Sequence, residues 1–113
     1  MPSPEILPVN FTISEAAKRA AEDIRAEYDA TWPDNPAAVL FVGWGITVPE
    51  TGPRSENVVL GYYQQSDLAA VEHGIQETSG VKLVFFITDE YHAKFEGRAL
   101  DYTRDRGFFL RGQ

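Results

Sequence analysis

The sequence predicts an α+β fold in which strands dominate mixed sheets, with a long N-terminal helix and one short helix in the final third. Three observations indicate this class. Apolar residues recur every three or four positions through residues 13–28, which is the period of an amphipathic helix. Runs rich in valine, isoleucine, phenylalanine and tyrosine follow, with the patterning of strands. Glycine, proline and polar residues separate these runs and mark the turns.

The first element follows a proline-containing lead-in. Prolines within residues 1–10 remove backbone donors and favour an extended or poorly ordered segment, so one domain is expected over residues 11–113. Thr12 and Glu15 have the spacing of a capping box, in which two side chains satisfy free N–H groups at a helix start. The predicted helix ends ahead of Pro33, because the residue before a proline is pushed out of the α region.

Two long strands are predicted next. Residues 38–48 begin as an apolar run and continue with alternation. Gly43 and Gly45 interrupt this strand, and they indicate either a bulge or a place where another backbone or group comes close. A polar loop over 49–57 leads to a second strand over 58–64.

The second half is predicted to contain shorter elements. They are a helical turn after Asp67, a strand at 75–78, a tight turn at Ser79-Gly80, a strand at 81–87, a short helix opened by Thr88 or Asp89 and closed by Gly97, and strands at 99–102 and 107–110. The run over 81–87 is almost continuously apolar, which is typical of a strand buried on both faces.

The composition excludes several classes of function. A formal net charge of −7 argues against nucleic-acid binding, which depends on a dense positive surface. No cysteine is present, so the chain can supply no thiolate to a disulfide, a metal, a cluster or a covalent reaction. No apolar run approaches the roughly 20 residues that span a bilayer, and the N-terminus lacks a signal-peptide pattern. We therefore expect a cytoplasmic protein with no membrane and no nucleic-acid partner.

The final third carries a distinctive order of features. They are the strand over 81–87, Asp89, the short helix over 91–95, Gly97, Leu100-Asp101-Tyr102 and Gly107-Phe108. This order resembles the end of the HesB-like or IscA-like domain, which is found in A-type iron–sulfur scaffold or carrier proteins. The opening residues 11–17 and the glycine-bearing strand at 39–45 are similar to the start of that domain. The resemblance implies a single HesB-like domain over residues 11–113.

The same comparison shows what the sequence lacks. Cluster-handling members of that family use one cysteine after the glycine-rich strand and a Cys-x-Cys type pair near the C-terminus, and this sequence has neither. Iron–sulfur clusters are held mainly by thiolates, so no family ligand can be assigned to any position here and no cofactor is expected. We interpret the chain as a degenerate HesB-like domain that has lost cluster ligation and acts as a non-catalytic binding or protein-interaction module.

An alternative function uses a histidine–carboxylate site. His92 and Glu96 lie one helical turn apart with Asp89 nearby, so one face could ligate a divalent metal or hold a small ligand, as in a binding protein or an enzyme. A single histidine among carboxylates is also common on solvated helices, and no nucleophile, phosphate-loop or metalloprotease motif is present. Asp101 is expected to accept backbone hydrogen bonds and Tyr102 to fill the core.

Aromatic residues suggest a surface for a protein partner or a homodimer. These residues are Trp44, Tyr62, Tyr63, Phe108 and Phe109. Adjacent residues on a strand point to opposite faces of the sheet. Either one member of each adjacent pair is exposed, as in interfaces where aromatic residues are enriched, or both sheet faces are covered. The sequence leaves both alternatives open.

Overall fold

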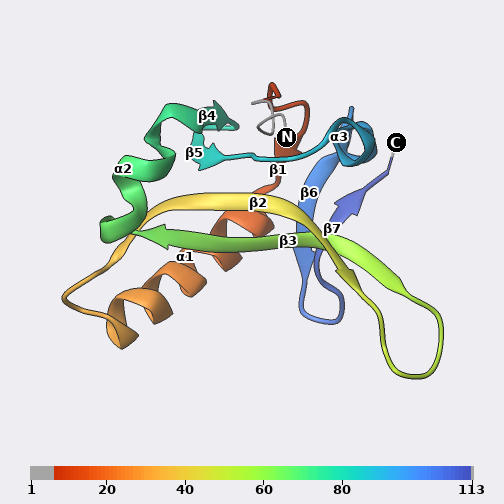
Figure 1. The fold of residues 1–113 in the computed structure, drawn as a ribbon, viewed down its shortest axis with the longest axis horizontal. Coiled ribbons are helices and arrows are strands. Elements are labelled where there is room, and N and C mark those ends of the chain that lie inside the picture. Colours follow the sequence, from red (N-terminus) through yellow and green to blue (C-terminus); the bar gives the residue numbers. More distant parts are fainter. Residues whose placement is uncertain (1–6, 113) are drawn as a thin grey trace.

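A computed structural model describes residues 7–112, and these residues form an α+β fold with two small mixed sheets (Figure 1). The strands are β1 (Thr12–Ile13), β2 (Ala37–Thr47), β3 (Ser55–Gln64), β4 (Ile75–Thr78), β5 (Val81–Val84), β6 (Ala99–Thr103) and β7 (Gly107–Arg111). The α-helices are α1 (Glu15–Thr31), α2 (Leu68–Val71) and α3 (Asp89–Phe95), and 3-10 turns at Gln65–Asp67 and Glu72–Gly74 flank α2. The predicted α+β class, with mixed sheets and a long N-terminal helix, is confirmed. Helix α3 is the short helix that the fold class included, and α2 is a second short helix.

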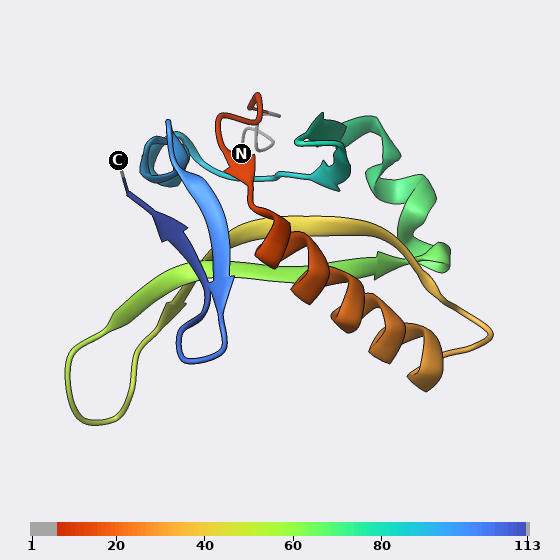
Figure 2. The same cartoon turned by 180° about the vertical axis from the view of Figure 1, so that it is seen from behind.

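Each sheet combines parallel and antiparallel pairs. The larger sheet has the order β3-β2-β5-β4, in which β2 runs antiparallel to β3 and parallel to β5. The smaller sheet has the order β1-β6-β7, with β1 parallel to β6. Strands β2 and β3 form a long twisted ribbon, and the loop that joins them projects away from α1 (Figures 1 and 2). The ribbon therefore has a free end that α1 does not cover.

The first helix begins two residues later than the capping box predicted. Ser14, rather than Thr12, is the N-cap, and its hydroxyl oxygen accepts a hydrogen bond from the Ala17 N–H at 3.1 Å. Thr12 is extended because it pairs with Ala99 in the parallel β1–β6 ladder. The predicted end is confirmed, since α1 stops at Thr31.

The predicted strands lie within one residue of their predicted bounds except at the start of β3 and the end of β5, and β1 was not predicted. The second long strand starts earlier than predicted, at Ser55. Strand β5 ends at Val84 rather than residue 87, although Phe85 and Ile87 beyond it are buried. The irregularity in β2 lies between residues 37 and 39 and not at the glycines. Gly45 is instead a close approach, because a Cβ there would lie 2.6 Å from a methyl group of Val59 on β3.

Both faces of the larger sheet are covered. On β2, Leu40 and Val42 belong to the main core, while Val39 belongs to a smaller cluster with Val71 of α2 and Val84 of β5. Three rings stand at the centre of the main core, with centroids about 5 Å apart: those of Phe11, Phe85 and Phe95. Such edge-on and tilted ring pairs contribute beyond their buried area.

The lead-in is only partly within the described residues. The prediction of an extended or disordered segment falls largely on residues 1–6, which lie outside them. Residues 7–10 are held by side chains of the body. The amide oxygen of Gln76 accepts from the Val9 N–H at 2.8 Å, and its amide nitrogen donates to the Leu7 carbonyl at 2.8 Å. None of the helices within residues 7–112 has the length and apolar character needed to cross a bilayer.

Candidate functional site

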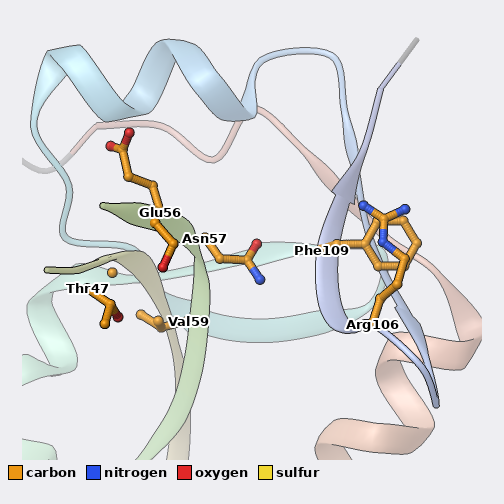
Figure 3. A pocket seen from close by; sticks show the side chains of 8 residues that line it. Thr47, Glu56, Asn57, Val59, Arg106 and Phe109 are labelled. Atoms are coloured by element: carbon orange, nitrogen blue, oxygen red, sulfur yellow. The ribbon is translucent and has the colours of Figure 1, made fainter. Parts of the chain in front are cut away.

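A cleft of about 460 Å³ lies between the free end of the β2–β3 ribbon and the β6–β7 hairpin. Figure 3 shows Arg106 and Phe109 on one side of this cleft and Thr47 and Val59 on the other. The lining residues are Gly45, Thr47, Ser55, Glu56, Asn57, Val59, Arg106 and Phe109. The walls are thus contributed by strands that are far apart in the sequence.

Asn57 joins the two walls. Its amide nitrogen donates to the Phe108 carbonyl of β7 at 3.0 Å, and its amide oxygen accepts from the Val58 N–H at 2.8 Å. Strands β3 and β7 are edge strands of different sheets, so this side chain links them where no backbone ladder does. The link ties the β2–β3 ribbon to the β6–β7 hairpin beside the cleft.

The charged groups around the cleft already have partners. The Arg106 guanidinium lies 3.8 Å from the centre of the Phe109 ring, a cation–π contact. One carboxylate oxygen of Glu56 accepts from the Trp44 indole N–H at 3.1 Å, and the other lies 3.6 Å from the Arg54 guanidinium. The charges of Arg106 and Glu56 are thus stabilised by these contacts while both side chains keep some exposure to solvent.

The groups that line the cleft can form hydrogen bonds and apolar contacts with a partner. Among the described residues, the hydroxyl groups of Thr47 and Ser55 form no hydrogen bond to a histidine or carboxylate that could activate them. A nucleophile needs such a base within hydrogen-bond reach. The site offers hydroxyl, amide and guanidinium groups beside apolar surface, which suits recognition.

Three exposed apolar side chains lie at the free end of the β2–β3 ribbon, and one of them, Val59, also lines the cleft. We call Ile46, Val48 and Val59 the ribbon-end surface, and their exposed fractions are 40%, 75% and 42%. Only Trp32 and Ile75 are comparably exposed large apolar residues within residues 7–112. The alternation of side chains along β2 and β3 indicates which residues share a face of the ribbon. The sequence does not reveal that the end of the ribbon is left without a covering helix.

The five aromatic residues proposed from the sequence do not form one exposed surface. Tyr62 is buried under α1, and its hydroxyl donates to the Ala21 carbonyl at 3.0 Å. Burial, with a smaller contribution from the nearby Glu22 carboxylate, raises the pKa of Tyr62 to about 12. Tyr63 is half-buried on the opposite face, against Phe41. The alternative in which both sheet faces are covered therefore holds for this pair.

The remaining three aromatic residues are also packed. Trp44 stacks on Tyr91 of α3 at 6.3 Å between ring centres, and Phe108 packs on Tyr102 at 4.9 Å. Phe109 is buried beneath Arg106. Of the five, only Phe109 lines the cleft.

The histidine–carboxylate residues are not brought together as a metal site. The described part of the chain contains no group of three histidine, aspartate or glutamate side chains that could hold a metal ion, so Asp89, His92 and Glu96 do not form one. The His92 ring instead lies against the lead-in, with its Nε2 2.8 Å from the Pro8 carbonyl oxygen. Its backbone carbonyl accepts from the Asn10 side chain at 3.0 Å. The residue anchors the N-terminal segment.

Asp101 has the structural role that its position suggested, with partners that the sequence did not reveal. One carboxylate oxygen accepts from the Ser14 hydroxyl at 2.6 Å and from the Tyr102 N–H at 2.8 Å. The other oxygen pairs with the Arg111 guanidinium. The Ser14 hydroxyl contributes most to lowering the pKa of Asp101 below its ordinary value of 3.8, and the backbone N–H of Tyr102 follows. The carboxylate ties the start of α1 to β6 and β7.

Comparison with protein-family models, with curated proteins and with solved structures gave no match.

Proposed function

We propose that the chain is a non-catalytic protein-interaction module, built on a HesB-like scaffold that has lost iron–sulfur ligation, and that its partner binds the ribbon-end surface and the adjoining cleft. The observation that carries this proposal is the exposure of Ile46, Val48 and Val59 at one free end of the β2–β3 ribbon, with Val59 on the cleft side and Ile46 on the opposite face. Exposed apolar side chains gathered in one part of a surface are typical of interaction sites.

The composition around the ribbon-end surface favours a protein partner. The interiors of interfaces are enriched in aromatic residues and arginine, as at Phe109 and Arg106. The partner is expected to be a different protein that presents apolar side chains. Two copies of this chain would each carry a formal net charge of −7, which opposes their association.

The order of elements supports the HesB-like part of the proposal. Strand β5, helix α3 and strand β6 follow one another as the resemblance implies, and Gly97 between the last two has a φ of 70° that suits glycine. The lack of cysteine supports the loss of cluster ligation, because soft thiolate ligands hold such clusters. A cytoplasmic location is part of the same proposal and is testable by cell fractionation.

One experiment tests the loss of cluster ligation. The purified chain is incubated anaerobically with iron and sulfide, desalted, and assayed for bound iron, bound sulfide and the visible absorption of a cluster. We expect neither metal nor absorption to remain. A stable, stoichiometric cluster would overturn this part of the proposal.

A second experiment tests the ribbon-end surface. A photo-crosslinking amino acid is placed at Val48 in the source cells, with the exposed Asp34 as the control position at the other end of the sheet. The captured protein is then purified, and its affinity is measured for the parent chain, for Val48→Asp and for the control Ala30→Asp on the exposed side of α1. We expect roughly tenfold weaker binding for Val48→Asp alone, about 1.4 kcal/mol.

Three outcomes count against the interaction proposal. They are equal capture from positions 48 and 34, unchanged affinity in Val48→Asp, and capture of a second copy of this chain. The last would assign the surface to a homodimer, which sedimentation of the parent chain and of Val48→Asp would then show directly. Val48 is 75% exposed in a loop, so its substitution tests binding with little effect on folding. Within residues 7–112, no group of three histidine, aspartate or glutamate side chains supports the alternative histidine–carboxylate function.

A further inference from the structure

A second cavity, of about 300 Å³, lies between α1, the larger sheet and the β4–β5 turn. Most of its lining is apolar. The lining residues are Ile13, Ala17, Lys18, Ala21, Glu22, Leu40, Leu60, Tyr62, Gly80, Val81 and Leu100. None of them lines the cleft at the ribbon end. The size is at the lower end of the range of small-molecule sites, roughly 300–1,000 Å³.

The residue sizes on α1 explain why this space is empty. The buried positions of the helix are all alanines, namely Ala17, Ala20 and Ala21. Ala17 and Ala21 line the cavity together with larger side chains of the sheet, including Leu40 and Leu60. Protein interiors are ordinarily packed with few voids larger than a water molecule. A space of this size beneath an alanine-faced helix therefore sets this region apart from the rest of the core.

An outer compartment of about 460 Å³ adjoins this cavity. The two compartments share Glu22, Leu40, Tyr62, Gly80 and Val81 as lining residues. The shared residues place the two compartments side by side, and we call the pair the groove, with a mostly apolar inner compartment and an outer compartment, the mouth, that also has charged residues in its lining. The Tyr62 hydroxyl donates its hydrogen bond to the Ala21 carbonyl, so this proton is not available for a hydrogen bond to a ligand.

The mouth carries unpaired positive charge. Arg25 and Lys82 line the outer compartment only, and within residues 7–112 neither forms an ion pair with a carboxylate within 4.0 Å. One carboxylate, that of Glu22, lines the same compartment. Lys18 at the inner end is already paired with Glu15 at 3.1 Å. The lining of the mouth thus carries two cations and one carboxylate on a chain whose formal net charge is −7, and Glu77 lies opposite Lys82 in the β4–β5 ladder.

We propose that this groove is a binding site for a straight-chain aliphatic carboxylate of medium length, with its chain in the inner cavity and its carboxylate at Arg25 and Lys82. The apolar inner lining accounts for the chain, since the transfer of methylene groups out of water drives such binding. The two cations of the mouth account for the anionic head. The site is independent of the ribbon-end surface.

The test is a homologous series from hexanoate to dodecanoate, added to the full chain below the concentrations at which each member forms micelles. Affinity is measured by calorimetry. It is expected to rise about fourfold per added methylene and then to reach a plateau at the length that fills the inner cavity. Labelled methyl groups report the location by NMR. Leu40, Leu60 and Leu100 are expected to shift, and Val48 at the ribbon end is not.

Three variants separate the parts of the site. Ala21→Leu fills the inner cavity and is expected to weaken binding by at least roughly tenfold. Lys82→Gln removes one cation from the mouth and is expected to weaken binding about two- to fivefold, whereas Glu22→Gln is expected to strengthen it by a similar factor. Arg104→Gln, an exposed cation on the β6–β7 turn that lines neither compartment, is the matched control.

The proposal is overturned if no member of the series binds saturably, or if affinity rises with length without a plateau. It is also overturned if the methyl shifts fall outside the groove, or if 1-octanol binds as tightly as octanoate. Should Ala21→Leu fail to fold, the two charge variants and the alcohol comparison still decide the matter. Because no protein partner is used, these results do not depend on the proposed interaction function.

Discussion

Replacing Asp101 with alanine is expected to lower the free energy of unfolding by about 3–5 kcal/mol, because two buried donors would lose a charged acceptor. Asp101 is only 3% exposed. Its bonds from the Ser14 hydroxyl and the Tyr102 N–H join the cap of α1 to β6. A hydrogen bond to a charged group contributes about 1.5–3 kcal/mol, so two such bonds give about 3–6 kcal/mol, a range that contains the expected loss.

The Arg111 partner is expected to matter much less. Its side chain is 66% exposed, and exposed ion pairs contribute roughly 0–1 kcal/mol. Arg111→Gln is therefore the matched control for Asp101→Ala. Urea unfolding followed by circular dichroism gives both free energies. The reasoning is refuted if Arg111→Gln is as costly as Asp101→Ala, or if Asp101→Ala loses less than about 1 kcal/mol.

The lowered pKa of Asp101 also fixes the sign of a pH dependence. The folded state holds this carboxylate ionised more strongly than the unfolded state does, so the unfolded state binds more protons in acid. The stabilisation is fully present above the ordinary value of 3.8 and is lost as the pH falls through the lower, folded-state pKa. The stability advantage of the parent chain over Asp101→Asn should therefore be constant near neutrality and shrink below pH 3.8. An advantage that grows in acid would contradict this assignment.

Three further changes test the packing. Gly61→Ala should lower the free energy of unfolding by about 1–3 kcal/mol, because the added Cβ would lie 2.6 Å from the ring of Phe41. Gly43→Ala is the control: its Cβ would meet only an ordinary contact at 3.7 Å, so urea unfolding should show almost no change. Phe85→Ala, at the fully buried centre of the aromatic cluster, should cost about 3–5 kcal/mol, and a loss below 2 kcal/mol in the same assay would disprove its central role. Gln76→Ala should speed hydrogen exchange at the Val9 amide while global stability changes little; unchanged exchange would show that other contacts hold the lead-in.

The elements that depend on local signals were predictable from the sequence. The amphipathic stripe and Pro33 predicted α1 and its end, and the Ser79-Gly80 turn has the positive φ values that its composition indicated. The strands at 75–78 and 99–103 also lie where their patterns placed them, to within one residue. Periodicity and turn chemistry are properties of neighbouring residues, so a short window of sequence contains them.

The start of α1 was not predictable in this way. Thr12 and Ser14 are both good caps, and Thr12 lost the role because it pairs with a strand 87 residues further along the chain. The early end of β5 has a similar origin, since its ladder with β2 covers only Leu83 and Val84. Competition between a local motif and a distant ladder is decided by the whole fold.

The sequence by itself determined that this protein is an α+β chain with no thiolate to offer a cluster, because patterning and composition are written in the residues. Only the tertiary structure decided which groups meet. It buried or packed the five aromatic residues and directed His92 to the lead-in. It left the ribbon end uncovered and opened a cavity beneath the alanines of α1. These outcomes depend on contacts between segments far apart in the chain, and a local pattern does not contain them.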